Sequence, residues 1–119
     1  MIKAVVLVKF YKGEINPFDA AALECALRLQ NLDITVLSMS PMHNKERMAY
    51  LSRLGVGRAI MLSDESFAGS DTLATSKVIS KALKKLSPQL VICGRQSIDG
   101  DTAQVPPQVA SMLGYDFIP

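Results

Sequence analysis

Short apolar runs alternate along the chain with longer segments in which apolar residues recur every three or four positions. Four of these runs are rich in Val, Ile and Leu and do not alternate strictly with polar residues, which is typical of parallel strands covered on both faces. The predicted strands are residues 2–8, 34–37, 56–62 and 90–93. The segments between them have the periodicity of helices, so strands and helices alternate along the sequence.

Local residue choices predict where these helices begin and end. Asn16 followed by Pro17 predicts a side-chain cap and the first helical residue, and Gly55 is typical of a helix stop. Leu54 and Leu73 are among the apolar residues that we expect to face inward. The predicted helices are residues 17–30, residues 43–53, a segment from Ser70 or Asp71 to Leu86, and a segment from Asp101 or Thr102 to Leu113.

This order of elements predicts a single α/β domain over residues 1–119. Its parallel sheet is expected to lie between two helical layers, in a three-layer α/β/α architecture with right-handed crossovers. Residues 115–119 combine aromatic and apolar side chains, as at the start of another strand. We therefore expect the chain to end before or within a fifth strand.

Composition and charge narrow the classes of function. Apolar residues make up 49% of the 119 residues, and 13 basic against 11 acidic residues give a net charge of +2. No basic run exceeds Lys84-Lys85, which argues against binding of nucleic acid or a membrane surface through charge. No apolar stretch approaches the ~20 residues of a membrane span, and the N-terminus lacks the layout of a signal peptide. We expect a soluble, cytoplasmic protein with no membrane insertion.

Cysteine and histidine are too scarce for most metal and hydrolytic sites. Cys25 and Cys93 lie far apart without a CxxC pattern, and His43 is the single histidine. These residues do not supply the ligand set of a zinc site, and no GxSxG nucleophile motif occurs. We interpret both cysteines as small apolar residues of the core and His43 as a surface residue.

The segment after the last predicted strand has the most distinctive chemistry. In open parallel sheets, ligands bind beyond the carboxyl ends of the strands, near the point where the strand order reverses. Residues 94–104 follow such a strand, and Gly94 and Gly100 allow close approach of the backbone. The free amides at 102–104 would open a helix and favour an anion such as phosphate. The alternative is an ordinary connecting loop in which Asp101 caps the helix.

Four blocks of the sequence indicate a family, and the last two of them are the specific ones. They are VVLVK at residues 5–9, INPFD at 15–19, FAGSDTLAT at 67–75 and CGRQSIDGDT at 93–102. In these blocks and in their order, the chain resembles the N-terminal portion of the beta subunit of electron-transfer flavoproteins. The resemblance implies a Rossmann-like, adenine-nucleotide-binding (HUP-type) fold with AMP or FAD as the cofactor. It also implies an alpha subunit that holds the redox flavin, and dehydrogenases as redox partners.

The same resemblance implies which residues would bind the nucleotide. Those expected beside the adenosine are Leu7, Lys9, Asn16, Pro17, Phe18, Asp19, Met39, Val91 and Ile92. Those expected around the ribose and phosphate are Gly94, Arg95, Gln96, Ser97, Ile98, Asp99, Gly100, Asp101, Thr102, Ala103, Gln104 and Val105. It implies no catalytic residue and no metal ligand, and any transferred electron would reside on a bound flavin.

Two other functions remain open at this point. The chain could be a stand-alone adenine-nucleotide-binding module, related in fold to universal stress proteins, that acts as a sensor or regulator and forms a homodimer. It could also be an adenylating enzyme of the same broad fold. The second is less favoured because no SGGxDS-like pyrophosphate loop follows the first strand, where Lys9-Phe10-Tyr11 stands instead.

Overall fold

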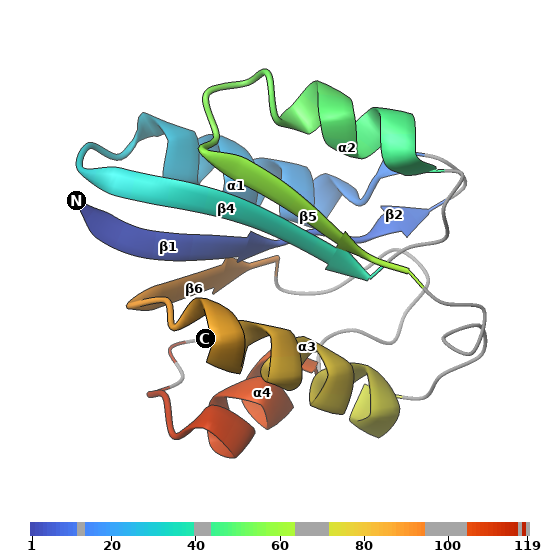
Figure 1. The fold of residues 1–119 in the computed structure, drawn as a ribbon, viewed down its shortest axis with the longest axis vertical. Helices are drawn as coiled ribbons and strands as arrows, with labels where there is room; N and C mark the ends of the chain where they lie inside the picture. Colours follow the sequence, from blue (N-terminus) through green and yellow to red (C-terminus); the bar gives the residue numbers. More distant parts are fainter. Residues whose placement is uncertain (12–13, 40–43, 64–71, 95–104, 117, 119) are drawn as a thin grey trace.

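A four-stranded parallel sheet forms the centre of the molecule in the computed structural model, which describes residues 1–11, 14–39, 44–63, 72–94, 105–116 and 118. The strand order is β5-β4-β1-β6, and each neighbouring pair is parallel (Figure 1). The strands are β1 (Ile2–Leu7), β4 (Leu32–Met39), β5 (Arg58–Leu62) and β6 (Leu90–Cys93). The predicted α/β architecture with a parallel sheet is confirmed.

Two helical layers cover the two faces of this sheet. Helices α1 and α2 lie on one face, and α3 and α4 lie on the other (Figure 1). Right-handed crossovers explain this arrangement, because the path from β5 back across the sheet to β6 runs opposite to the earlier steps and needs its helix on the other face. The helices are α1 (Pro17–Arg28), α2 (Lys45–Leu51), α3 (Thr72–Leu86) and α4 (Val105–Leu113).

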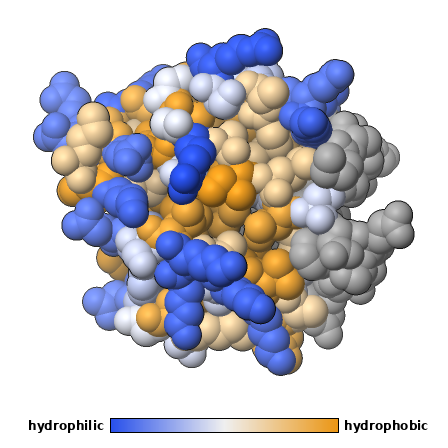
Figure 2. Space-filling view, viewed as in Figure 1, coloured by the Kyte–Doolittle hydropathy of each residue, from blue (hydrophilic) through white to orange (hydrophobic). Residues whose placement is uncertain are grey.

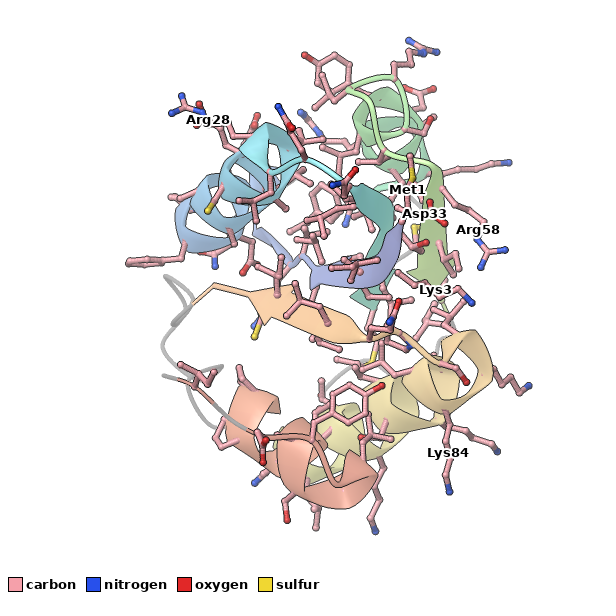
Figure 3. All side chains as sticks on the ribbon, turned by 90° about the vertical axis from the view of Figure 1, so that its left-hand side faces the viewer. Met1, Lys3, Arg28, Asp33, Arg58 and Lys84 are labelled. Atoms are coloured by element: carbon pink, nitrogen blue, oxygen red, sulfur yellow. The ribbon has the colours of Figure 1, made fainter. Side chains whose placement is uncertain are left out.

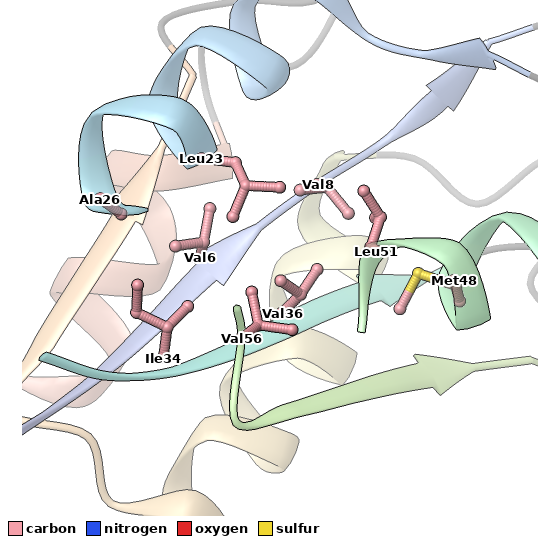
Figure 4. Packing of buried hydrophobic residues seen from close by; sticks show 9 residues of the cluster. All are labelled: Val6, Val8, Leu23, Ala26, Ile34, Val36, Met48, Leu51 and Val56. Carbon is pink, nitrogen blue, oxygen red and sulfur yellow. The ribbon is translucent and has the colours of Figure 1, made fainter. Parts of the chain in front are cut away.

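Alternate residues of β1 supply the two halves of the core. Val6 packs with Leu23 of α1 and Met48 of α2 on one face (Figure 4). Val5 packs with Leu83 of α3 on the other face, together with Val109 of α4. Val5 and Val6 are both buried because β1 is a central strand and helices cover both faces of the sheet. This explains why the sequence of β1 is continuously apolar rather than alternating.

The edge strands are less covered than the central ones. Residues of β5 and β6 are half-buried, except for the exposed Arg58 and Leu90 at their amino ends. Figure 2 views the molecule from the side on which the edge strand β5 lies in front. Hydrophobic residues lie across the middle of this surface, with hydrophilic residues around them. None of the helices in the described part of the chain combines the length and the apolar character that crossing a bilayer requires.

Several local predictions are corrected by the structure. The segment after β1, where no strand was predicted, contains an antiparallel hairpin of β2 (Phe10–Tyr11) and β3 (Glu14–Ile15). The strand predicted at 34–37 extends over Leu32–Met39 because it pairs on both sides, with β1 and with β5. The strand predicted at 56–62 begins at Arg58, and α1 and α2 end earlier than predicted, at Arg28 and Leu51.

Two side chains predicted to face inward are exposed. Leu54 is 42% exposed because α2 ends before it, and Leu73 is 46% exposed at the start of α3. The helix stop predicted at Gly55 is wrong because α2 ends at Leu51, and Gly55, with a positive φ of 101°, lies in the turn that follows. Gly114, which directly follows α4, has a positive φ of 73°. The predicted caps at Ser70, Asp71, Asp101 and Thr102 lie outside the described residues, as does His43.

Candidate functional site

The carboxyl ends of β1 and β6 lie side by side at the point where the strand order reverses. From β1 the chain continues to β4 on one side, and it later returns to β6 on the other side, where Leu7 is paired with Cys93. A crevice at such a point is where open parallel sheets bind ligands. Lys9 and Gly94 follow the two strand ends, so the structure brings these predicted site residues to one place.

The carboxylate of Asp19 bridges the two strand ends. Its Oδ2 accepts a hydrogen bond from the backbone N–H of Lys9 at 2.8 Å, and its Oδ1 accepts one from the backbone N–H of Gly94 at 3.1 Å. Asp19 belongs to the first turn of α1 and is only 7% exposed. Three elements that are distant in sequence, namely β1, α1 and β6, therefore meet at one buried carboxylate.

The electrostatics of the crevice follow from this burial. Desolvation raises the pKa of Asp19, although the hydrogen bonds from Lys9, Asn16 and Gly94 and the charge of Lys9 oppose the shift. Burial also raises the pKa of the Cys93 thiol to about 11, and the neighbouring Asp19 adds to that shift. Cys93 is therefore a neutral thiol at physiological pH, and it packs against the core as expected. The same expectation for Cys25 is wrong, because Cys25 is exposed.

Asn16 connects the hairpin to the site in a way that differs from the prediction. Its side chain makes no capping hydrogen bond to the α1 backbone and instead hydrogen-bonds to Asp19. Its backbone N–H donates to the carbonyl of Lys9 at 2.7 Å, and its own carbonyl accepts from the N–H groups of Asp19 and Ala20. The side-chain cap was wrong because the buried carboxylate of Asp19 takes the Asn16 amide.

Gly94 is required by close approach of the backbone. A Cβ at this position would lie 2.8 Å from the carbonyl carbon of Phe18 and 2.9 Å from the backbone nitrogen of Asp19. These atoms belong to the backbone of α1 and its start, so they can move only with the helix. The N-terminus of α1 is thus packed directly against the residue that follows β6.

A cavity of about 450 Å³ lies beside β6, between this strand, α4 and the last described residues. Leu7, Val91 and Cys93 form part of its wall on the sheet, and Val109 of α4 faces them. The hydroxyl of Tyr115 donates to the carbonyl of Pro88 at its rim. The volume falls within the range of ~300–1,000 Å³ that is typical of small-molecule pockets.

The remaining predicted residues are distributed around this crevice. Met39 is half-buried at the carboxyl end of β4, where it pairs with Leu62 rather than with β1. Ile92 packs on the face opposite to that of Val91. Pro17 and Phe18 are exposed at the start of α1, and Val105 begins α4. The predicted residues outside the described part of the chain are Arg95, Gln96, Ser97, Ile98, Asp99, Gly100, Asp101, Thr102, Ala103 and Gln104.

Cys93 and Tyr115 line the cavity but were not among the predicted site residues. The position of Cys93 at the end of a strand was a usable sign, because strand ends form the ligand-binding edge. Tyr115 follows the helix stop at Gly114, and nothing in the local sequence indicated its hydrogen bond to Pro88. Within the described ranges, no group of three or more His, Cys, Asp or Glu residues is arranged to hold a metal ion.

Comparison with known proteins gives consistent matches along the chain. A family model described as the electron transfer flavoprotein domain matches residues 4–119. The chain is 46% identical over 102 residues to the electron transfer flavoprotein subunit beta of Thermoanaerobacterium thermosaccharolyticum, a match covering 83% of this chain and 39% of that protein. It is 46% identical over 128 residues to the subunit of the same name from Megasphaera elsdenii, covering 98% of this chain and 47% of the relative.

A third relative carries a different name. The chain is 44% identical over 108 residues to the protein FixA of Azorhizobium caulinodans, which covers 84% of this chain and 38% of that protein. The chain therefore spans less than half the length of each of these three relatives.

Proposed function

The chain belongs to the electron transfer flavoprotein domain family, and from this premise we propose that it is the nucleotide-binding part of a beta-type electron-transfer subunit. In this proposal it binds an adenine nucleotide, AMP or FAD, at the carboxyl ends of β1 and β6. It pairs with an alpha-type subunit that holds the redox flavin. In the resulting heterodimer, the flavin receives electrons from dehydrogenases. The names of the relatives support a beta-type role in electron transfer.

The observation that carries the proposal is the crevice between β1 and β6 together with the cavity of about 450 Å³ beside it. The described residues fit an adenine nucleotide. Leu7 and Val91 offer an apolar wall of the kind that an adenine ring needs, and Gly94 follows directly where a side chain would collide with α1. Apolar walls with a few polar groups at one end are typical of nucleotide pockets.

In this arrangement the chain binds and orients the nucleotide, and a bound flavin would supply the redox chemistry. The backbone of Lys9 and Gly94 is fixed by hydrogen bonds to Asp19, so the edge that would face the nucleotide is organised before binding. Preorganisation of this kind lowers the entropic cost of binding. The residues predicted beside the adenosine and around the phosphate, apart from the side chain of Asp19, are proposed as its contacts.

Thermal unfolding in the presence of AMP, ADP, ATP, NAD and FAD in turn tests nucleotide binding. A ligand at a hundred times its dissociation constant should add roughly 2.7 kcal/mol to the free energy of unfolding, which raises Tm by several degrees. Guanosine monophosphate serves as the control for base recognition. If none of the adenine nucleotides raises Tm, the proposal that this chain binds an adenine nucleotide is wrong.

A pair of neighbouring variants tests which face of β6 holds the nucleotide. Val91→Ala removes apolar surface from the cavity wall and should weaken binding about tenfold if both lost methyl groups contact the ligand. Ile92→Val removes one methylene on the opposite face and should leave the affinity unchanged within about twofold. Isothermal titration gives both constants, and equal losses in the two variants would contradict this placement.

The pairing with an alpha-type subunit is tested separately, by mixing the chain with an alpha-type subunit and measuring the mass of the species by light scattering. A heterodimer supports the proposal. A homodimer of this chain that ignores the alpha-type subunit would favour the stand-alone module.

A further inference from the structure

Among the described residues, two backbone amides at the crevice that would suit an anion are already occupied. Paired N–H groups beyond the carboxyl ends of parallel strands are donors that an anionic ligand could use. Here the N–H groups of Lys9 and Gly94 point at the two oxygens of one carboxylate, at 2.8 and 3.1 Å. That carboxylate belongs to Asp19, so the chain itself supplies the anion.

We propose that Asp19 is a positioning residue for the nucleotide site: an internal carboxylate that fills the anion-accepting notch between β1 and β6 and fixes the backbone at Lys9 and Gly94. This proposal rests on the proposed function for its effect on nucleotide affinity. The structural part of it, the notch and its built-in anion, does not depend on any nucleotide.

Burial and bonding distinguish this carboxylate from an ordinary acidic residue in the first turn of a helix. Asp19 is 7% exposed, and Asn16, which hydrogen-bonds to it, is 1% exposed. A carboxylate in such surroundings is costly to desolvate unless several donors compensate the charge. The donors lie just after β1, just after β6 and just before α1, so the carboxylate connects parts of the chain that are far apart in sequence.

The carboxylate of Asp19 makes the notch negatively charged. A second anion placed on the N–H groups of Lys9 and Gly94 would have to displace Asp19 or lie against it, and like charges repel strongly at short range in a poorly solvated site. The phosphate of a nucleotide is therefore excluded from these two amides. The carboxylate acts on binding through the positions of Lys9 and Gly94 rather than by contact.

Chemical rescue of Asp19→Ala by formate tests this role. The substitution removes the carboxylate and leaves a space next to the two amides that donated to it, which formate can fill with the same two oxygens. We expect D19A to have a lower Tm than the wild type in sodium chloride. Replacing chloride by about 0.1 M formate at constant ionic strength should raise Tm of D19A by several degrees more than that of the wild type.

Two variants serve as controls. Asp33→Ala makes the same chemical change at an exposed aspartate of β4, so formate should shift its Tm no more than it shifts that of the wild type. Gly94→Ala retains Asp19, but the new Cβ would overlap with Oδ1 of Asp19 and with the backbone carbonyl carbon of Phe18, so it displaces the carboxylate and α1 together. Formate should not rescue it, because the Cβ and the retained carboxylate leave no space for a second anion in the notch.

Nucleotide titration gives the second measurement. If the proposed function is correct, D19A should bind the nucleotide about tenfold more weakly in chloride, and formate should restore the affinity to within about threefold of the wild type. A loss of affinity that formate does not restore, with Tm restored, would mean that Asp19 contacts the nucleotide and is not a positioning residue.

The outcomes separate the two proposals. If the wild type binds no nucleotide but formate rescues Tm of D19A selectively, the proposed function fails and the internal anion stands. If formate raises Tm of D19A no more than that of the wild type, the positioning role is overturned. If D19A does not fold in chloride, refolding from urea in formate decides in the same way: recovery supports the proposal, and failure in both salts overturns it.

Discussion

An aspartate lies close to a glycine both at the carboxyl ends and at the amino ends of the strands, but only the first of these two aspartates is buried. We call these two sides of the sheet its carboxyl edge and its amino edge. At the carboxyl edge, Asp19 is buried, and Gly94 lies against the backbone at the start of α1. At the amino edge, Asp33 is exposed, and a Cβ on Gly57 would lie 2.8 Å from its Oδ1 and 3.4 Å from the carbonyl oxygen of Ile34. Figure 3 looks onto this amino edge, where Asp33 is labelled beside Arg58.

The difference lies in what surrounds each pair. Asp33 can rotate into solvent, so its contact with Gly57 can be relieved at little cost. Asp19 cannot move without breaking its bonds to Lys9 and Gly94, and Gly94 is confined by backbone atoms. A short contact between an aspartate and a glycine therefore constrains the sequence only where the carboxylate is buried and has several donors.

The largest expected effect is that of Gly94→Ala. Its Cβ would overlap with the carbonyl carbon of Phe18 and the nitrogen of Asp19, so α1 must shift away from β6. We expect a loss of about 3 kcal/mol in the free energy of unfolding, at the upper end of what overpacking costs. Urea unfolding followed by circular dichroism measures it. A loss below about 1 kcal/mol would mean that α1 adapts freely and that the carboxyl edge is not rigid.

Asp19→Ala should have the next largest effect on stability. It leaves the amides of Lys9 and Gly94 without their acceptor, but it also removes the cost of burying a charge. We expect a net loss of about 2 kcal/mol in urea unfolding. Stability equal to that of the wild type would show that water replaces the carboxylate without cost, and the contrast with Asp33 would then disappear.

The Cys93 thiol should make the free energy of unfolding depend on pH. Its pKa is raised from 9.0 to about 11 in the folded chain, so the unfolded chain loses this proton first as the pH rises. Stability is therefore unaffected by this group below pH 9 and falls as the pH rises from 9 toward 11. Cys93→Ala should lack this part of the decline.

The measurement is urea unfolding between pH 8 and pH 11. After allowance for solvent screening, the wild type should lose about 1 kcal/mol more than C93A over this interval. The exposed Cys25 offers the matched control, since Cys25→Ala should leave the slope of the wild type unchanged. Parallel curves for the wild type and C93A would show that the thiol is solvated in the folded state.

The smallest effect is expected at the amino edge. Gly57→Ala requires only that the Asp33 side chain rotate, and alanine reduces the entropy of the unfolded chain, so stability should change by less than about 0.5 kcal/mol. Asp33→Ala should be similarly neutral. A loss at Gly57 as large as that at Gly94 would remove the distinction between the two edges.

The fold class could be predicted from local patterns because most of its elements depend on them. The continuous apolar run of β1 and the helix start at Pro17 need no distant partner to be recognised. The hairpin of β2 and β3 could not be recognised in this way, because two-residue strands have too little periodicity. The exposure of Leu54 was mispredicted because the end of α2 depends on packing.

The candidate site was predicted less completely. The resemblance of the sequence to a family brought Lys9, Asp19 and Gly94 into one set, but it gave no indication of how they contact each other. The bridge from Asp19 to the other two residues joins positions 10 and 75 residues away along the chain. No local pattern encodes such a contact, since it forms only when three separate elements are packed together.

The order and type of the main elements were determined by the sequence alone, because hydrophobic periodicity and helix-end residues act over a few neighbouring positions. The tertiary structure decided which strands became neighbours, and therefore which backbone amides were available to one carboxylate. The same aspartate side chain is a buried bridge at position 19 and an exposed group at position 33. The physical reason is that desolvation and hydrogen bonding depend on every atom nearby, and those atoms come from distant parts of the chain.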